Sequence, residues 1–102
     1  MRLRNPAVYI LASQRNGTLY IGVSADLIAR ISVHRQKLVP GFSRRYGVTM
    51  LVYWEEYPTM LEAIAREKRL KKFYRAAKIA LIEAANPEWR DLWFEISGER
   101  QE

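Results

Sequence analysis

Four residues near the start of the chain carry side chains suited to work on a phosphate group. Tyr20 and Gly22 lie in the short apolar run TLYIGV. Arg30 and His34 follow it and are four residues apart, a spacing that places them one turn from each other on one face of a helix. A guanidinium can grip a phosphate with two hydrogen bonds, and an imidazole can donate or accept one more. The alternative interpretation is a solvated basic stripe with a lone histidine.

Glu67 is a carboxylate in the apolar line of a later helix. The line runs through Ala63, Glu67, Leu70 and Tyr74, a spacing typical of a buried face. The surrounding stretch AREKRLKKFYRAAK holds seven Lys or Arg and no other acid. Glu67 is therefore either a structural anion that neutralises bases, for instance Lys71 at i+4, or a ligand for a divalent metal at a phosphate site. Mg²⁺ prefers such hard oxygen donors and completes its shell with water and substrate phosphate.

Together these residues supply a phenol, an arginine, a histidine and a carboxylate. Metal-assisted hydrolysis of a phosphodiester needs a base for the attacking water, a cation for the charge that develops, and a metal for the leaving oxygen. The set of side chains matches those requirements.

The charge of the chain favours a polyanionic partner. Its 102 residues carry 17 Lys and Arg against 11 Asp and Glu. From Glu83 onward there are six acids and two bases, so that residues 1–82 hold 15 bases and five acids. Nucleic acid is the commonest partner for such a field, although the bases could instead serve solubility. The bases predicted to bind nucleic acid are Arg35, Lys37, Arg44, Arg45, Lys68, Lys71 and Lys72.

Length and composition favour a single domain over residues 1–102. An apolar content of 49% with 12% aromatic residues is enough for one hydrophobic core. The absence of cysteine excludes disulfides and thiolate zinc sites, so we expect a cytoplasmic protein. The apolar run from Ala7 to Ala12 is too short for a signal-peptide core or a membrane span, and it reads as a buried strand.

The first half of the chain predicts a hairpin followed by a helix. The runs AVYILA and TLYIGV flank Asn16 and Gly17, a pair that is a strong signal for a hairpin turn. We expect Ser24 to cap a helix with Asp26 in its first turn, running to about Lys37.

The second half predicts a strand, two helices and a tail. VTMLVYWEEY is rich in strand-forming residues. Thr59 and Glu62 form a capping box for a helix that reaches about Phe73, and RAAKIALIEAAN forms another that ends near Asn86. The acidic and aromatic tail, residues 87–102, is expected to pack back on the domain. The fold class is α+β, in the order β-β-α-β-α-α, with helices that cover a small, largely antiparallel sheet.

The hairpin assigns side chains to the two faces of the sheet. A two-residue turn at Asn16 and Gly17 would place Leu11 opposite Gly22. The face expected to be pure core holds Val8, Ile10, Leu19, Ile21 and Val23, and the other holds Tyr9, Leu11, Tyr20 and Gly22. On the second face Gly22 leaves backbone bare, so another group can approach closely. The tyrosines could also be ordinary strand residues with hydroxyls at the surface.

The sequence resembles the GIY-YIG nuclease superfamily, and within it the small single-domain bacterial branch. The resemblance covers about residues 7–86: AVY at residues 7–9 stands at the first signature tripeptide, and YIG at residues 20–22 is the second signature. Ala7 replaces the first glycine of the signature, and within these 102 residues we expect no room for the extra DNA-recognition domain that members usually carry.

The resemblance implies a three-stranded antiparallel sheet flanked by helices and an endonuclease that cuts DNA with one Mg²⁺ or Mn²⁺ ion, in repair or recombination. Arg30 falls on the catalytic arginine of the family, His34 on a histidine found in part of it, and Glu67 on its metal-binding glutamate. Tyr20, assisted by Tyr9 or His34, would deprotonate or position the attacking water. An unperturbed phenol has a pKa of about 10, so a role as base needs a neighbouring cation.

Two other functions remain open from the sequence. A binding module for nucleic acid could keep the fold and the basic face without cutting. An adaptor could use the apolar segment EWRDLWFEI to bind a protein partner or a second copy of the chain. The joint presence of Tyr20, Arg30 and Glu67 favours the enzyme, because a lone carboxylate without a metal repels phosphate.

Overall fold

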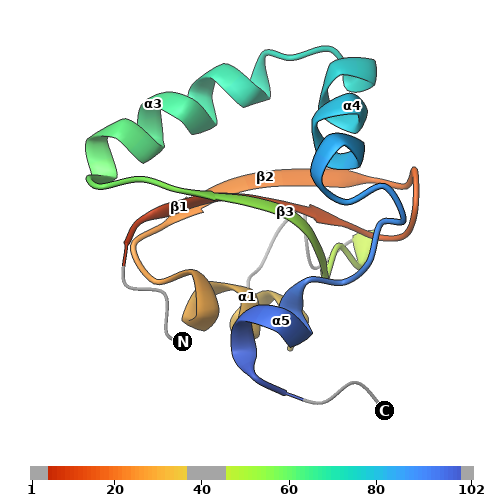
Figure 1. Ribbon diagram of the computed structural model, residues 1–102, viewed down its shortest axis with the longest axis horizontal. Helices are drawn as coiled ribbons and strands as arrows, with labels where there is room; N and C mark the ends of the chain where they lie inside the picture. The colour runs from red at the N-terminus through yellow and green to blue at the C-terminus, as the bar shows by residue number, and fades with distance from the viewer. Residues whose placement is uncertain (1–4, 37–45, 100–102) are drawn as a thin grey trace.

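Three antiparallel strands form the sheet of this protein, whose computed structural model describes residues 5–36 and 46–99. The strand order is β2-β1-β3. The elements are β1 (Ala7–Ala12), β2 (Leu19–Ser24), α1 (Leu27–Arg35), β3 (Met50–Glu56), α3 (Met60–Lys71), α4 (Arg75–Ala85) and α5 (Trp93–Ser97). The predicted fold class and element order are confirmed. In Figure 1, α3 and α4 lie above the sheet, and α1 and α5 lie below it.

Both faces of the sheet are core, which corrects the expectation of a single core face. β1 is the central strand, and all six of its residues are buried. Val8 and Ile10 belong to the cluster under α3 and α4, whereas Tyr9 and Leu11 belong to the cluster with α1 and α5. The second face is buried because α1 and the C-terminal tail cover it. The side chains that alternate along β1 therefore pack into two cores, one on each face of the sheet.

The hairpin turn lies one residue earlier than the sequence suggested. The Gly17 N–H donates to the carbonyl of Gln14 at 2.9 Å, and Asn16 takes the left-handed conformation with φ 57°. The predicted pairing of Leu11 with Gly22 is wrong: Tyr9 faces Gly22 and Leu11 faces Tyr20. Because the register differs by two residues, each side chain stays on its predicted face.

Asp26, and not Ser24, caps α1. The Asp26 side chain accepts a hydrogen bond from the Ala29 N–H at 3.2 Å. The Ser24 hydroxyl instead accepts from the Asp26 N–H at 3.0 Å, which makes a local turn before the helix. The helix ends at Arg35, and Lys37 lies outside the described residues.

The capping box of α3 is confirmed, but the helix ends at Lys71 before reaching Phe73. Thr59 accepts from the Glu62 N–H at 3.2 Å. The expectation that Tyr74 lies on the buried face is wrong, since its exposed fraction is 86%. Tyr74 comes after the helix has ended, where helical periodicity no longer applies.

The described part of the C-terminal tail, residues 87–99, packs back on the domain, as predicted. α4 ends at Ala85 and is capped by Asn86, whose buried amide donates to the carbonyls of Val52 at 3.1 Å and Arg90 at 2.9 Å. Trp89 joins the core above the sheet, and Trp93 joins the core below it. A contact between two copies through this tail would therefore have to use its other residues. Within residues 5–36 and 46–99, the helices are too short or too polar to cross a bilayer.

Candidate active site

Tyr9 and Gly22 form a close contact at the edge of the sheet. Tyr9 lies on the central strand directly opposite Gly22 on the edge strand β2. A Cβ atom at Gly22 would lie 2.4 Å from both Cζ and Oη of Tyr9, closer than carbon atoms can pack. The ring therefore passes over the bare backbone of Gly22. The glycine allows the Tyr9 hydroxyl to reach the outer edge of the sheet.

Tyr9, Tyr20 and His34 form a group of packed aromatic side chains, referred to below as the ring cluster. The ring centroids lie 6.3 Å apart for Tyr9 and Tyr20, 5.7 Å for Tyr9 and His34, and 5.2 Å for Tyr20 and His34. Tyr9 Oη is 3.0 Å from His34 Nε2 in a buried hydrogen bond. The helical spacing of α1 brings His34 onto this face, so the two signature strands and the helix meet at one point.

His34 is neutral at physiological pH. Burial, and then the positive charge of Arg30, lower the pKa of His34 to about 4. A neutral imidazole has one donor and one acceptor nitrogen. Its Nε2 can accept the proton of the Tyr9 hydroxyl while the Tyr9 oxygen accepts from another donor.

Arg30 lies beside the Tyr9 hydroxyl and can be that donor. Hydrogen bonding with Tyr9 raises the pKa of Arg30, so the guanidinium stays charged. Burial raises the pKa of Tyr9 to about 12, although the Arg30 hydrogen bond opposes the increase. Tyr9 is consequently protonated at neutral pH. The cationic guanidinium of Arg30 therefore lies beside two neutral rings, those of Tyr9 and His34.

Glu67 approaches this arrangement from the other side of the sheet. α3 packs against β2 and β1, and the negative charge of Glu67 is one of the influences that raise the pKa of Tyr9. The Glu67 side chain is 16% exposed, and its Oε2 lies 3.3 Å from Nζ of Lys71. The predicted pair of Glu67 with Lys71 is thus present, and the alternative role of Glu67 as a metal ligand stays a prediction.

The residues fit a divalent ion bound by a single carboxylate. In residues 5–36 and 46–99 there is no group of three or more His, Cys, Asp or Glu placed to hold a metal. Glu67 is a hard oxygen donor that retains access to solvent. Mg²⁺ commonly binds through one or two carboxylates and fills its shell with water and phosphate oxygens. Such an ion would depend on the substrate for part of its coordination.

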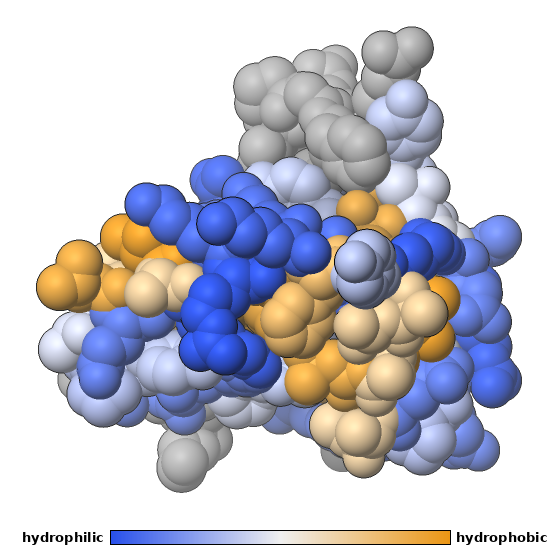
Figure 2. Space-filling model, turned by 90° about the horizontal axis from the view of Figure 1, so that it is seen from above, coloured by the Kyte–Doolittle hydropathy of each residue, from blue (hydrophilic) through white to orange (hydrophobic). Residues whose placement is uncertain are grey.

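The predicted nucleic-acid contacts fall into separate groups. Lys68 and Lys71 of α3 and its C-cap Lys72 are exposed, and Figure 2 shows a broad hydrophilic band across this face beside an apolar patch. Lys37, Arg44 and Arg45 lie outside the described residues.

Arg35 already has partners within the molecule. Its guanidinium lies 2.6 Å from Asp91 and 5.3 Å from the ring centroids of Trp93 and Phe94. Asp91 also accepts from the Leu51 N–H at 3.1 Å. To bind phosphate, Arg35 would have to leave a carboxylate that ties α1 to β3 and α5.

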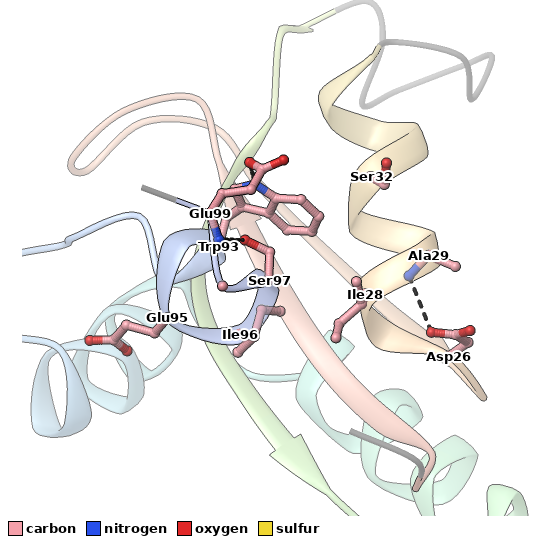
Figure 3. A pocket seen from close by; sticks show the side chains of 10 residues that line it. Asp26, Ile28, Ala29, Ser32, Trp93, Glu95, Ile96, Ser97 and Glu99 are labelled. Atoms are coloured by element: carbon pink, nitrogen blue, oxygen red, sulfur yellow. Dashed lines mark hydrogen bonds between the residues drawn. The ribbon is translucent and has the colours of Figure 1, made fainter. Parts of the chain in front are cut away.

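A hollow of about 630 Å³ lies between α1 and α5, away from the ring cluster. Figure 3 shows Glu99 beside Trp93, with Ile28, Ala29 and Ser32 of α1 facing them. Its walls hold three acids, Asp26, Glu95 and Glu99. That charge is wrong for a polyanion, so this hollow is not the phosphate site.

A polar network centred on Glu55 of β3 was not predicted from the sequence. Arg66 of α3 donates to both oxygens of Glu55, at 2.9 and 3.0 Å. Tyr57 donates to Glu55 at 2.7 Å, and Tyr53 donates to its other oxygen. Burial opposes ionisation of Glu55, but these hydrogen bonds hold its pKa below the usual range. The available signal was alternation, since Tyr53, Glu55 and Tyr57 share one face of an extended chain.

Comparisons with known proteins agree with this geometry. The family model described as the GIY-YIG catalytic domain matches residues 5–80. A UPF0213 protein of Staphylococcus aureus strain Mu3 is 35% identical over 75 residues, which are 74% of this chain and 90% of that protein; one from strain N315 gives the same values. The solution NMR structure of a UPF0213 protein from Bacillus halodurans superposes with a TM-score of 0.54 and 28% identity, covering 85% of this chain and 92% of that chain.

Proposed function

The chain belongs to the GIY-YIG family of nucleases, and from this premise we propose that it is an endonuclease that hydrolyses phosphodiester bonds in DNA with one divalent ion. The observation that carries the proposal is the contact of Tyr9 with His34 over Gly22, with the charged Arg30 beside the same hydroxyl. A buried ring pair of this kind holds a cation in a fixed place at the edge of the sheet, which is what a charged transition state requires.

Arg30 is the group that would meet the phosphate. Its guanidinium is partly exposed and stays charged beside Tyr9. It can donate two hydrogen bonds to the non-bridging oxygens and stabilise the charge that grows there. Because Tyr9 fixes one side of the guanidinium, little reorganisation is needed when the substrate binds.

Tyr20 is the group that would contact the attacking water. A pKa of about 12 for Tyr9 and of about 4 for His34 leaves neither poised to take up a proton at neutral pH. We therefore assign to Tyr9 and His34 the role of orienting the side chains of Arg30 and Tyr20. Tyr20 is more exposed than Tyr9 and packs against His34, so its hydroxyl can position a water molecule.

Glu67 is the residue that would hold the ion. A bound Mg²⁺ or Mn²⁺ supplies charge for the leaving oxygen and lowers the pKa of coordinated water. Lys71 is 55% exposed, and its pair with Glu67 is of the kind that contributes little to stability. Lys71 can therefore turn from Glu67 to a substrate phosphate, where it would join Lys68 and Lys72.

A binding module that does not cut is the second candidate. The Glu67–Lys71 pair favours it, because that pair accounts for the carboxylate without any metal. In this case the ring cluster and Arg30 would recognise a phosphate and leave it intact.

The experiment that separates the two uses the purified chain with labelled duplex, nicked, branched and single-stranded substrates, in DNA and RNA forms. Each substrate is incubated with Mg²⁺, Mn²⁺ or EDTA. The proposal predicts cleavage of a DNA substrate with a divalent ion and none with EDTA. Tight, salt-sensitive binding without cleavage of any substrate would favour the binding module.

A further inference from the structure

The network around Glu55 ties α3 to the far edge of the sheet. The Arg66 guanidinium makes a bidentate contact with the Glu55 carboxylate. The two side chains are only 19% and 14% exposed. Hydrogen bonds from Tyr53 and Tyr57 occupy further acceptor positions of the same carboxylate. Paired, charge-assisted hydrogen bonds fix direction as well as distance. This contact is therefore more specific in geometry than an exposed ion pair.

The buried side chains of α3 lie along a single line, which fixes the rotation of the helix about its axis less firmly than a directed side-chain contact does. The helix rests on the sheet through Ala63 and Leu70, which are fully buried and lie two turns apart along one line. A single line of contact allows a helix to roll. Arg66 reaches sideways from this line to β3, and its guanidinium also lies 5.8 Å from the ring centroid of Phe73.

Arg66 and Glu67 are consecutive residues, so they point to different sides of the helix, about 100° apart. Arg66 is directed to β3, at one edge of the sheet, so Glu67, on the other flank of the line through Ala63 and Leu70, lies towards β2, the strand at the other edge against which α3 also packs. A roll of α3 that breaks one of these placements must disturb the other. With side-chain tips about 5 to 6 Å from the axis, a roll of about 20° moves a tip by roughly 2 Å.

We propose that Glu55 and Arg66 are positioning residues, and that their ion pair fixes the rotation of α3 so that the Glu67 carboxylate is held at the cleavage site. This inference rests on the proposed function, in which Glu67 binds the divalent ion. A displacement of about 1 Å at a catalytic group can cost on the order of 10² in rate. The pair would thus matter for metal binding beyond its contribution to stability.

The central variant is Glu55→Gln, which keeps the shape of the side chain but removes its charge. Mn²⁺ binding is followed by water-proton relaxation, and the Mg²⁺ concentration for half-maximal cleavage is measured in parallel. We expect the dissociation constant for Mn²⁺ and the Mg²⁺ concentration for half-maximal cleavage each to rise about tenfold. This factor is the lower end of the loss in metal affinity that follows removal of a residue hydrogen-bonded to a metal ligand. Arg66→Lys, which keeps the charge but loses the fork, should show a smaller rise and serves if Glu55→Gln does not fold.

Glu62→Gln is the matched control, since Glu62 belongs to the capping box at the start of the same helix. It should lower the thermal midpoint without changing the metal requirement. A double variant tests the route of the effect. In a Glu67→Gln background, Glu55→Gln should change neither Mn²⁺ binding nor residual cleavage any further.

Equal metal requirements in the parent and in Glu55→Gln, with a lower thermal midpoint in the variant, would overturn the inference and leave the network a structural contact only. An additional loss in the double variant would overturn the route through Glu67. If the parent itself neither binds Mn²⁺ nor cleaves, the proposed function fails, and the inference fails with it. The parent measurement alone distinguishes this outcome from a failure of the inference only.

Discussion

On the α1 side of the sheet the candidate site is held by packed rings, whereas on the α3 side it is held by ion pairs. Tyr9 and His34 are almost fully buried, and the Tyr9 ring packs directly on the bare backbone of Gly22. Glu67 instead keeps contact with solvent and is oriented by charged neighbours. The difference suggests that the cation for the phosphate is in place before substrate binds, while the metal ligand depends on partners that solvent and salt can weaken.

Removing Arg30 should give the largest effect on the ring side. Arg30→Ala should reduce single-turnover cleavage by about 10² to 10³, the range for loss of one preorganised donor. The dissociation constant should shift only a few-fold, because several other bases share the binding. Arg30→Lys should restore little, since an ammonium cannot reproduce a two-pronged contact. Equal losses in rate and affinity would make Arg30 a binding residue.

Gly22→Ala tests how tightly the ring side is packed. The new Cβ would lie 2.4 Å from the Tyr9 ring, so Tyr9 must move and its bond with His34 must break. We expect a loss of about 1 to 3 kcal/mol in the free energy of unfolding, measured by chemical denaturation. Adding Tyr9→Leu should restore much of that stability but not the cleavage rate. A fully active Gly22→Ala protein would contradict the close contact.

Acidification should weaken the ring side selectively. The folded pKa of His34 is about 4, below the ordinary 6.5, so the neutral form is favoured by folding. Its stabilising contribution is present above pH 6.5 and is lost as the pH falls from there towards 4. Between pH 7 and pH 5 the free energy of unfolding should drop by about 2 kcal/mol. In His34→Gln this part of the pH dependence should disappear; an unchanged profile would show that His34 does not titrate in this way.

The smallest effects should come from single lysines at the C-terminal end of α3 and its cap. Affinity for DNA should fall steeply with salt, and Lys68→Ala or Lys72→Ala should each lower the slope of log affinity against log salt by about one. Glu62→Gln, on the same helix, is the control for helix stability. A dissociation constant that does not vary with salt would remove nucleic acid from the account.

Local patterns predicted the strands, and with them the faces of the sheet. The alternation of side chains along the strands placed Tyr9, Tyr20 and Gly22 on one face. That assignment is unaffected by the register error, because a shift of two residues leaves each side chain on the same face. The error itself arose because Asn16, and not Gly17, adopts the left-handed conformation of the turn. Propensity alone does not decide between two neighbours that both tolerate positive φ.

Contacts between distant segments were beyond such patterns. Arg35 was predicted to face nucleic acid, yet Asp91, 56 residues later, pairs with it. Glu55 and Arg66 come from different elements, and no local spacing joins them. The neutral state of His34 depends on burial by α1 and the sheet together. Residue types therefore predicted the chemistry, and tertiary packing determined which charges are free to perform it.

Cleavage by Glu67→Gln tests the central claim most directly. The variant and a matched Lys71→Gln variant, which loses the other half of the same ion pair, are assayed on the best DNA substrate across a Mg²⁺ titration, with binding measured in EDTA. The account predicts that Glu67→Gln binds DNA and keeps its fold but loses divalent-dependent cleavage, whereas Lys71→Gln still cuts. Cleavage by Glu67→Gln at the rate of the parent, or unfolding of both variants, would contradict it and leave the carboxylate a structural partner of Lys71.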